Sequence, residues 1–275
     1  MSGISRNFEV WAKDKPCPNF QNMVYNKAMP HFFIDNDCIK NDIITVSDKE
    51  TVNHLVNARR VKVGETVKFI DQNKIQYVGI VTSADKKSLT AKIEDKYPSF
   101  RELDIDLTVA RCVLKQDADF SALQKATELG AKTIIPLISD NCAMKDSVIL
   151  AKADKFQKIA DESVKQCERA DFPTVLPPVH LDKFLMEGLS PFDKVLVFSE
   201  RAKGFGIKKY FAQNPYKQGD KILAVIGCEG GFSDREFKLF EELNLPEISL
   251  GKLIMRADTA LTAALFGIIQ EVSDD

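Results

Sequence analysis

Residues 224–237 read AVIGCEGGFSDREF and carry the clearest signs of a binding site. The first letters are typical of a buried strand, and Ser233 with Glu236 has the spacing of a capping box, which predicts that a helix begins there. The turn between them contains Gly227, Gly230 and Gly231. Glycines at a strand end let the backbone approach a ligand closely, and open α/β sheets bind ligands beyond the carboxyl ends of their strands. We therefore expect this loop to form one wall of a pocket.

A second motif follows closely, where residues 247–269 read EISLGKLIMRADTALTAALFGII. Their order predicts a short strand, Gly251, an apolar bridge from Leu253 to Met255, Arg256 and then a helix. Two glycine-bearing strand ends that feed two helices would make a compact site. Neither loop is a usual nucleotide loop, because GxGxxG and GxxxxGK[ST] are both absent. Each loop alone could equally be a tight connection, and the small residues of the last helix could equally serve helix packing.

The pattern of predicted strands and helices that must position these loops changes near residue 97. Residues 29–96 read as short strands separated by turn formers, with one helical stretch at 49–59, which predicts a small β-barrel. Residues 97–275 alternate strands with helices, which predicts a mainly parallel sheet covered on both faces. The expected strands are 105–113, 133–138, 194–200, 221–227 and 247–250, and the expected helices are 119–130, closed by Gly130, and 154–170. Residues 1–28 are expected to be an N-terminal extension.

Composition narrows the class of function. Lys and Arg number 38 against 40 Asp and Glu, so the net charge of -2 gives no global field that would attract nucleic acid. The six cysteines and three histidines are scattered, which argues against a metal site or a histidine-based triad, and we expect reduced thiols. No apolar run reaches the ~20 residues that span a bilayer, and residues 1–28 show no recognisable targeting signal. We therefore expect a cytoplasmic protein.

Taken together, IGCEGGFSDRE and ISLGKLIMRADTA resemble the signature of the SPOUT methyltransferases. They are most similar to the RsmE-like branch, which methylates N3 of a uridine in small-subunit (16S) ribosomal RNA. Further stretches that agree are LKQDADFSALQKATELGAKTIIPLISDNCA, ADESVKQCERADFPTVLPPV, and MPHFFI followed by NHLVNARRVKVGETVKFID. The chain departs from the branch at Cys228, where proline is usual, at Asp258, where glutamate is usual, and at Asn141, where arginine is common. The resemblance covers about residues 29–272.

This resemblance implies an α/β fold in which a SPOUT-type trefoil-knotted, mainly parallel sheet domain at 97–275 follows a small PUA-like β-barrel RNA-binding domain at 29–96. It also implies S-adenosylmethionine as the methyl donor and a homodimer formed through the C-terminal helices. By motif, the donor-binding residues are Phe198, Ser199, Glu200, Ile226, Gly227, Cys228, Gly230, Gly231, Ser249, Leu250, Gly251, Leu253, Met255, Arg256 and Thr259. The flat, neutral adenine suits apolar walls, although Leu253 and Met255 could equally be plain core residues.

Methyl transfer to a uracil nitrogen requires that the two partners are positioned and that the anionic ring is favoured. By resemblance, Arg169 is the first candidate to stabilise the ring and Arg256 is the second. Glu229 would orient an arginine or meet the ribose or amino group of the donor. Arg169 could instead be an exposed cation at a helix end, where a positive charge is mildly stabilising.

Contact with RNA is expected from the barrel and from Lys115. The run NARRVKVGETVK brings together Arg59, Arg60, Lys62 and Lys68, with one acid, Glu65. Such cations bind phosphates without choosing sequence, although a run of this kind can equally be a solvated face. The expected partner is ribosomal RNA or the small ribosomal subunit, and neither a membrane nor a metal is expected.

Two other functions stay open at this point. The departures at Cys228, Asp258 and Asn141 would suit an RNA-binding or ribosome-assembly protein that has lost catalysis. A thiol at a strand-to-helix turn would suit a hydrolase, since a helix N-terminus lowers the pKa of a thiol. No histidine lies near Cys228 in the sequence, however, and the pattern is GCEGG in place of GxSxG.

Overall fold

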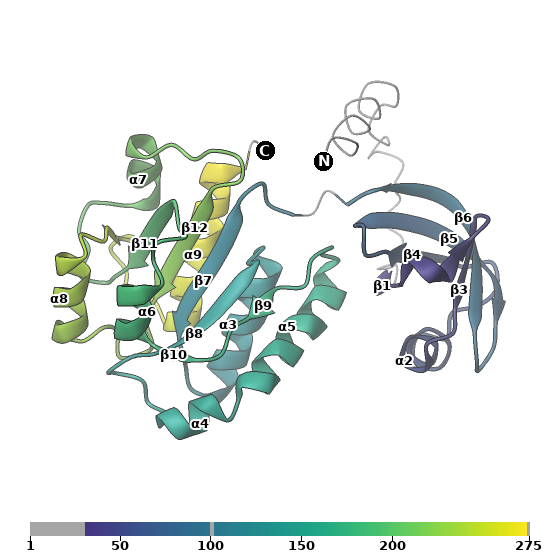
Figure 1. Ribbon diagram of the computed structural model, residues 1–275, viewed down its shortest axis with the longest axis horizontal. Helices are drawn as coiled ribbons and strands as arrows, with labels where there is room; N and C mark the ends of the chain where they lie inside the picture. The colour runs from purple at the N-terminus through teal and green to yellow at the C-terminus, as the bar shows by residue number, and fades with distance from the viewer. Residues whose placement is uncertain (1–30, 100–101, 274–275) are drawn as a thin grey trace. The chain divides into compact units, whose positions relative to one another are not determined.

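The computed structural model describes residues 31–99 and 102–273 of the chain (Figure 1). The chain divides into two compact units. The N-terminal unit includes residues 37–69 and 78–95, and the larger unit runs from residue 96 onward and includes 33–36 and 70–77. The expected N-terminal extension, residues 1–28, lies outside the described residues.

The first part of the described chain forms a six-stranded sheet with the order β1-β4-β5-β6-β3-β2. The strands are β1 His31–Phe33, β2 Ile39–Lys40, β3 Ile43–Val46, β4 Thr66–Ile70, β5 Ile75–Ala84 and β6 Leu89–Pro98. Burial alternates along β3, as expected for a strand with one covered face. The helical stretch predicted at 49–59 is confirmed as α2, Lys49–Val52, and a π-helical turn, Asn53–Ala58.

The larger unit contains a seven-stranded sheet with the order β10-β8-β7-β12-β11-β13, and β9 pairs with β8. The strands are β7 Asp106–Cys112, β8 Thr133–Ile138, β9 Thr174–Val175, β10 Val179–His180, β11 Lys194–Phe198, β12 Lys221–Ile226 and β13 Glu247–Ile248. All of its pairings are parallel. Strands β7 and β12 are buried after their first residue, which is typical of the centre of a sheet covered on both faces.

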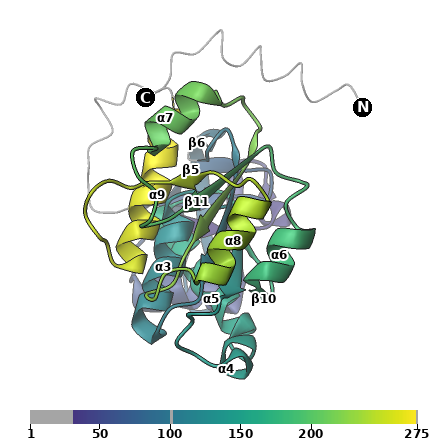
Figure 2. The ribbon, with the colours of Figure 1, turned by 90° about the vertical axis from the view of Figure 1, so that its left-hand side faces the viewer.

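Helices cover both faces of this sheet (Figures 1 and 2). On one face lie α3 Gln116–Glu128, α5 Ala153–Cys167 and α9 Ala257–Val272, and on the other lie α6 Leu181–Glu187 and α8 Asp234–Glu242. Two shorter helices are α4 Asp146–Leu150 and α7 Ile207–Gln213. None of the helices described is long and apolar enough to cross a membrane. The prediction of a mainly parallel α/β domain is confirmed, and the trefoil knot stays a prediction.

Local sequence signals set several of these boundaries. The capping box predicted before α8 is confirmed, since the Glu236 amide donates to the Ser233 hydroxyl at 3.2 Å and the Ser233 amide donates to the Glu236 carboxylate at 2.7 Å. Gly130 closes α3 with a φ of +84°, as predicted. Strand β13 is shorter than predicted, because Ser249 forms only an isolated bridge with Gly206.

Candidate functional site

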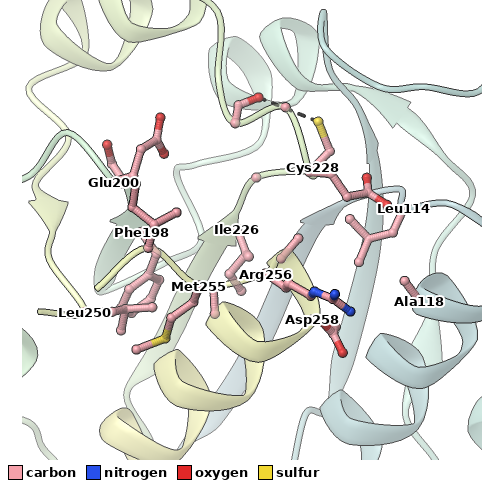
Figure 3. A pocket seen from close by; sticks show the side chains of 18 of the residues that line it. Leu114, Ala118, Phe198, Glu200, Ile226, Cys228, Leu250, Met255, Arg256 and Asp258 are labelled. Atoms are coloured by element: carbon pink, nitrogen blue, oxygen red, sulfur yellow. Dashed lines mark hydrogen bonds between the residues drawn. The ribbon is translucent and has the colours of Figure 1, made fainter. Parts of the chain in front are cut away.

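A cavity of about 910 Å³ opens at the carboxyl ends of the parallel strands. Its walls come from the segments that follow β7, β11, β12 and β13 and from the first turn of α9. Figure 3 shows Phe198, Leu250 and Met255 on one side of it and Leu114 and Ala118 on the other. Small-molecule sites usually enclose ~300–1,000 Å³. The cavity therefore has room for a nucleotide-sized ligand.

The loop from Gly227 to Gly231 lines the cavity with backbone because its neighbours leave little room for side chains. A Cβ at Gly231, where φ is +64°, would lie 2.9 Å from an oxygen of Glu200. A Cβ at Gly230 would lie 3.0 Å from the Cβ of Asn141. The Asn141 amide also donates to the carbonyls of Gly230 at 3.1 Å and Gly231 at 3.3 Å. The segment after β8 thus braces this loop from behind.

The segment between β13 and α9 supplies a second wall. Gly251 adopts a φ of +116°, and its amide donates to the Ser249 hydroxyl at 3.2 Å. Leu253 is 80% exposed and Ile254 is 91% exposed, whereas Met255 is half-buried beside the cavity. The alternative that Leu253 is a plain core residue is therefore wrong.

A third wall comes from the end of β7 and the start of α3, and sequence reasoning missed it. Its residues are Leu114, Asp117, Ala118 and Ser121. The buried Asp119 carboxylate holds this turn, since it accepts from the Leu114 amide at 3.0 Å and pairs with the buried Arg111. The sequence signals were the strand-to-helix junction and the resemblance of the stretch that begins at Leu114, but neither assigned these residues to the cavity. What brings it to the cavity is the pairing of β7 with β12, which local patterns do not reveal.

Negative charge predominates among the ionisable side chains that line the cavity. The acids are Asp117, Glu200, Glu229 and Asp258, and the bases are Lys252 and Arg256. Glu229 is held in place, because its Oε1 accepts from the Lys115 amide at 3.0 Å. The ammonium of Lys125, which donates to Asp258 at 3.1 Å, lowers the pKa of that carboxyl. Such a lining suits a ligand that carries positive charge.

Most residues predicted to bind the donor lie together in this cavity. Those that line it are Phe198, Ser199, Glu200, Ile226, Gly227, Cys228, Gly230, Gly231, Leu250, Gly251, Leu253, Met255 and Arg256, together with the predicted catalytic Glu229. Ser249 and Thr259 are not among the lining residues. Ser249 instead supports Gly251, and Thr259 is exposed on α9. The binding role of each residue stays a prediction.

Arg169 does not line the cavity, contrary to the expectation. It is 2% exposed, and its guanidinium donates to the carbonyls of Thr127 and Ala131, both at 2.8 Å, and pairs with Glu102 at 2.8 Å. Glu102 also accepts from the amides of Ala170 at 2.8 Å and Asp171 at 3.0 Å. The alternative of an exposed helix-end cation is also wrong. This geometry gives Arg169 the role of joining the chain after α5 to the end of α3.

Cys228 lines the cavity but has no histidine beside it, among the described residues there, that would activate it as the nucleophile of a hydrolase. It is buried, and both the nearby Cys142 thiol and its burial raise the pKa of its thiol. None of the described residues that line the cavity is a histidine. Across residues 31–99 and 102–273, no group of three or more His, Cys, Asp or Glu side chains is placed to hold a metal ion. The geometry therefore does not support a thiol hydrolase.

The residues predicted to contact RNA belong to both units. Arg59, Arg60 and Lys62 are exposed in the N-terminal unit, but Lys68 is buried, so it does not extend their surface. Lys115 is exposed at the start of α3, next to the wall formed by Leu114.

Known proteins share these two regions. A family model described as an RNA methyltransferase domain matches residues 101–269, and one described as an RNA methyltransferase PUA domain matches residues 46–94. Ribosomal RNA small subunit methyltransferase E of Bacillus subtilis is 30% identical over 223 residues, which are 80% of this chain and 87% of that protein. Its namesake in Mesomycoplasma hyopneumoniae is 30% identical over 247 residues, which are 90% of this chain and 100% of that protein.

A solved structure of a protein with the same name is similar to this chain in its fold. The crystal structure of a ribosomal RNA small subunit methyltransferase E from Neisseria gonorrhoeae bound to S-adenosyl methionine aligns with a TM-score of 0.71. The two chains are 25% identical, and the alignment covers 88% of this chain and 97% of that one.

The buried pair between Arg169 and Glu102 can be tested by substitution. Arg169→Ala should lower the free energy of unfolding by ~3–5 kcal/mol, because it leaves Glu102 partly buried without its charged partner. Urea denaturation followed by circular dichroism measures this. The matched control is Arg201→Ala, which breaks the exposed pair with Asp234 and should cost about 1 kcal/mol or less. Equal effects of the two substitutions would contradict a structural role for Arg169.

Proposed function

Because the chain belongs to the ribosomal RNA small subunit methyltransferase E family, we propose that it transfers a methyl group from S-adenosylmethionine to N3 of a uridine in 16S ribosomal RNA. The observation that carries this proposal is the cavity at the strand ends, lined by the backbone of the glycine loop and by the segment before α9. The family match over 101–269 supports the same activity.

The cavity fits the donor in both shape and charge. Apolar side chains of Phe198, Leu250 and Met255 suit the flat adenine, and backbone groups of the glycine loop suit its hydrogen-bonding edge. The carboxylates of Glu200 and Asp258 suit the cationic methionine end. When bound, S-adenosylmethionine supplies a methyl group on a positively charged sulfonium, so the protein does not need to activate the electrophile.

The contribution of this chain is to position the base and favour its anionic form. Arg256 is the arginine among the described lining residues, and it stands at the N-cap of α9 with its side chain exposed. We assign it the role of stabilising negative charge on the uracil ring. Glu229, fixed by the Lys115 amide, is suited to accept hydrogen bonds from the ribose or the amino group of the donor.

Binding of the RNA is assigned to cations outside the cavity. We propose that Arg59, Arg60 and Lys62 contact phosphates in a PUA-like RNA-binding domain at 29–96, and that Lys115 does so in a methyltransferase domain at 97–275. Such contacts fix the orientation of the RNA but do not choose its sequence. The site of action is assigned to the cytoplasm, where ribosomal subunits are assembled.

A homodimer is the proposed assembly. Leu253, Ile254 and Phe266 are 80%, 91% and 53% exposed, and Phe266 lies on α9. Exposed large apolar side chains such as these favour contact with another protein surface. A second copy of the chain, related by a two-fold axis, would cover the same residues on both molecules.

Loss of the Arg256 guanidinium should slow transfer without abolishing donor binding. Removing one group that stabilises transition-state charge costs ~10²–10³ in rate, so Arg256→Ala should lower kcat by about that factor. The measurement is methyl incorporation into 16S RNA taken from a strain without the gene, in which the target nucleotide is unmethylated. Mass mapping of the RNA after the reaction locates the modified nucleotide. Lys208→Ala, an exposed cation on α7, is the control. Donor binding without any methylated uridine in the wild type would instead favour an assembly protein that lacks catalysis.

The glycine loop offers a test of the donor site. Gly231→Ala should weaken S-adenosylmethionine binding by about tenfold or more, since the new methyl group meets Glu200 within the cavity and the left-handed strain of ~1–2 kcal/mol is relieved by a shift of backbone that lines it. Gly204→Ala is the matched control, because Gly204 has a similar φ of +71° but has open space around it and does not line the cavity. Calorimetry should show unchanged affinity for Gly204→Ala. Equal affinities for both variants would remove the loop from the donor site.

The proposed dimer depends on the apolar surface of α9. Phe266→Glu should convert the protein to a monomer of 30.8 kDa, because the charge would be buried at the interface. Light scattering after size exclusion measures the mass. Met186→Glu places the same charge at a residue of α6 that is 72% exposed, and it should leave the dimer intact. A wild-type mass that is already monomeric would refute the proposal.

A further inference from the structure

Three thiols from three strand ends meet around one hydroxyl group. The Ser139 hydroxyl lies 3.3 Å from the sulfur of Cys142 and 3.7 Å from the sulfur of Cys228, and Ser139 also neighbours Cys112. Cys112 ends β7, Cys142 follows β8, and Cys228 follows β12. Of the three, only Cys228 also lines the cavity.

The three thiols differ in their chemistry. Cys112 is 0% exposed and does not line the cavity, and burial raises the pKa of its thiol, so it is the least accessible of the three to an oxidant. Cys142 is half-buried, and its sulfur and the sulfur of Cys228 share the Ser139 hydroxyl as a neighbour. The nearby Cys228 thiol, together with the hydroxyl and the amide of Ser139, lowers the pKa of Cys142. The nearby Cys142 thiol, together with burial, raises the pKa of Cys228.

We propose that Cys142 and Cys228 are an oxidisable pair, which a peroxide converts to a disulfide that disturbs the donor loop. A reactive, partly accessible thiolate beside a second thiol is the arrangement found at redox-sensing sites. The cross-link itself does not depend on the proposed function, but its effect on donor binding rests on that function.

The chemistry has two steps and needs only hydrogen peroxide as oxidant. The Cys142 thiolate attacks one peroxide oxygen, the O–O bond breaks, and the leaving hydroxide takes up a proton to form water, which leaves Cys142 as a sulfenic acid. The sulfur of Cys228 then attacks the sulfur of Cys142 and loses its proton. An S–S bond forms, the S–O bond breaks, and a second water leaves. One peroxide is thus reduced to two waters while two thiols are oxidised.

The disulfide would act on the loop through contacts that hold it now. The thiol of Cys228 donates to the Gly231 carbonyl at 3.6 Å, and the Gly231 amide donates to the Cys228 carbonyl at 3.0 Å. Oxidation removes the first of these donors and draws the Cys228 sulfur to Cys142, away from Gly231. Since Gly227 to Gly231 line the cavity with backbone, a small shift there changes the donor site directly.

Peptide mapping tests the cross-link on the full-length protein. Trypsin places Cys142 on TIIPLISDNCAMK, Cys228 on ILAVIGCEGGFSDR, Cys112 on CVLK and Cys167 on QCER. After treatment with hydrogen peroxide and alkylation of the remaining thiols, we expect the first two peptides joined, with a mass two hydrogens below their sum, and separated again by dithiothreitol. Oxidation of Cys142 without this pair, or a pair that contains Cys112, would overturn the inference.

Calorimetry with S-adenosylmethionine tests the effect on the loop. Oxidised wild-type protein should bind at least about tenfold more weakly than reduced protein and should recover with dithiothreitol. Cys142→Ser should bind normally and resist peroxide, whereas the control Cys167→Ser should respond like the wild type. A cross-link that leaves affinity unchanged would overturn the assigned effect. If the reduced protein binds no donor, the proposed function fails, but the peptide map still shows whether Cys142 and Cys228 form a disulfide. The peptide map also decides this question if Cys142→Ser does not fold.

Discussion

The register of four neighbouring parallel strands is the constraint on which the candidate site depends. Arg111 of β7 pairs with Ile226 of β12, Ile226 pairs with Phe198 of β11, and Phe198 pairs with Ile248 of β13. These residues form one row across the sheet, so the segments that follow them leave the sheet at the same level. Because parallel strands place all their carboxyl ends at one edge, loops far apart in sequence become walls of a single cavity.

Buried ion pairs fix the segments that the sheet alone does not hold. Arg111 and Asp119 anchor the turn after β7, and Arg169 and Glu102 join the chain after α5 to the end of α3. Such pairs add little net stability compared with apolar packing, but breaking one leaves an uncompensated charge in the interior. Their effect is therefore to specify one arrangement of the turns around the cavity. Tight packing against Glu200 and Asn141 does the same for the glycine loop.

Sequence periodicity predicted the parallel sheet, most strand positions and the helix that begins after Ser233, because these depend on neighbours within a few residues. The resemblance identified most of the cavity residues, since many of them lie in two contiguous motifs. The wall around Leu114 and the burial of Arg169 were not predicted. Both depend on partners distant in the chain, Glu229 and β12 in the first case and Glu102 in the second. A motif identifies an arginine but not the direction of its side chain.

The positions at which the resemblance predicts departures from the family pattern have contacts that can be considered together. By the resemblance, proline would stand at Cys228 and stiffen the loop by its ring, whereas in this structure Asn141 holds the loop from outside. Ser139, two residues before Asn141, donates to the sulfur of Cys228 at 3.7 Å. Cys228 and Asn141 thus belong to one contact between the segments after β8 and β12. Asp258 likewise has a partner in Lys125, so its shorter side chain is fixed at the cavity. The loop is thus held by hydrogen bonds from a neighbouring segment, a restraint that depends on contacts between segments in the way that the ring of a proline at position 228 would not.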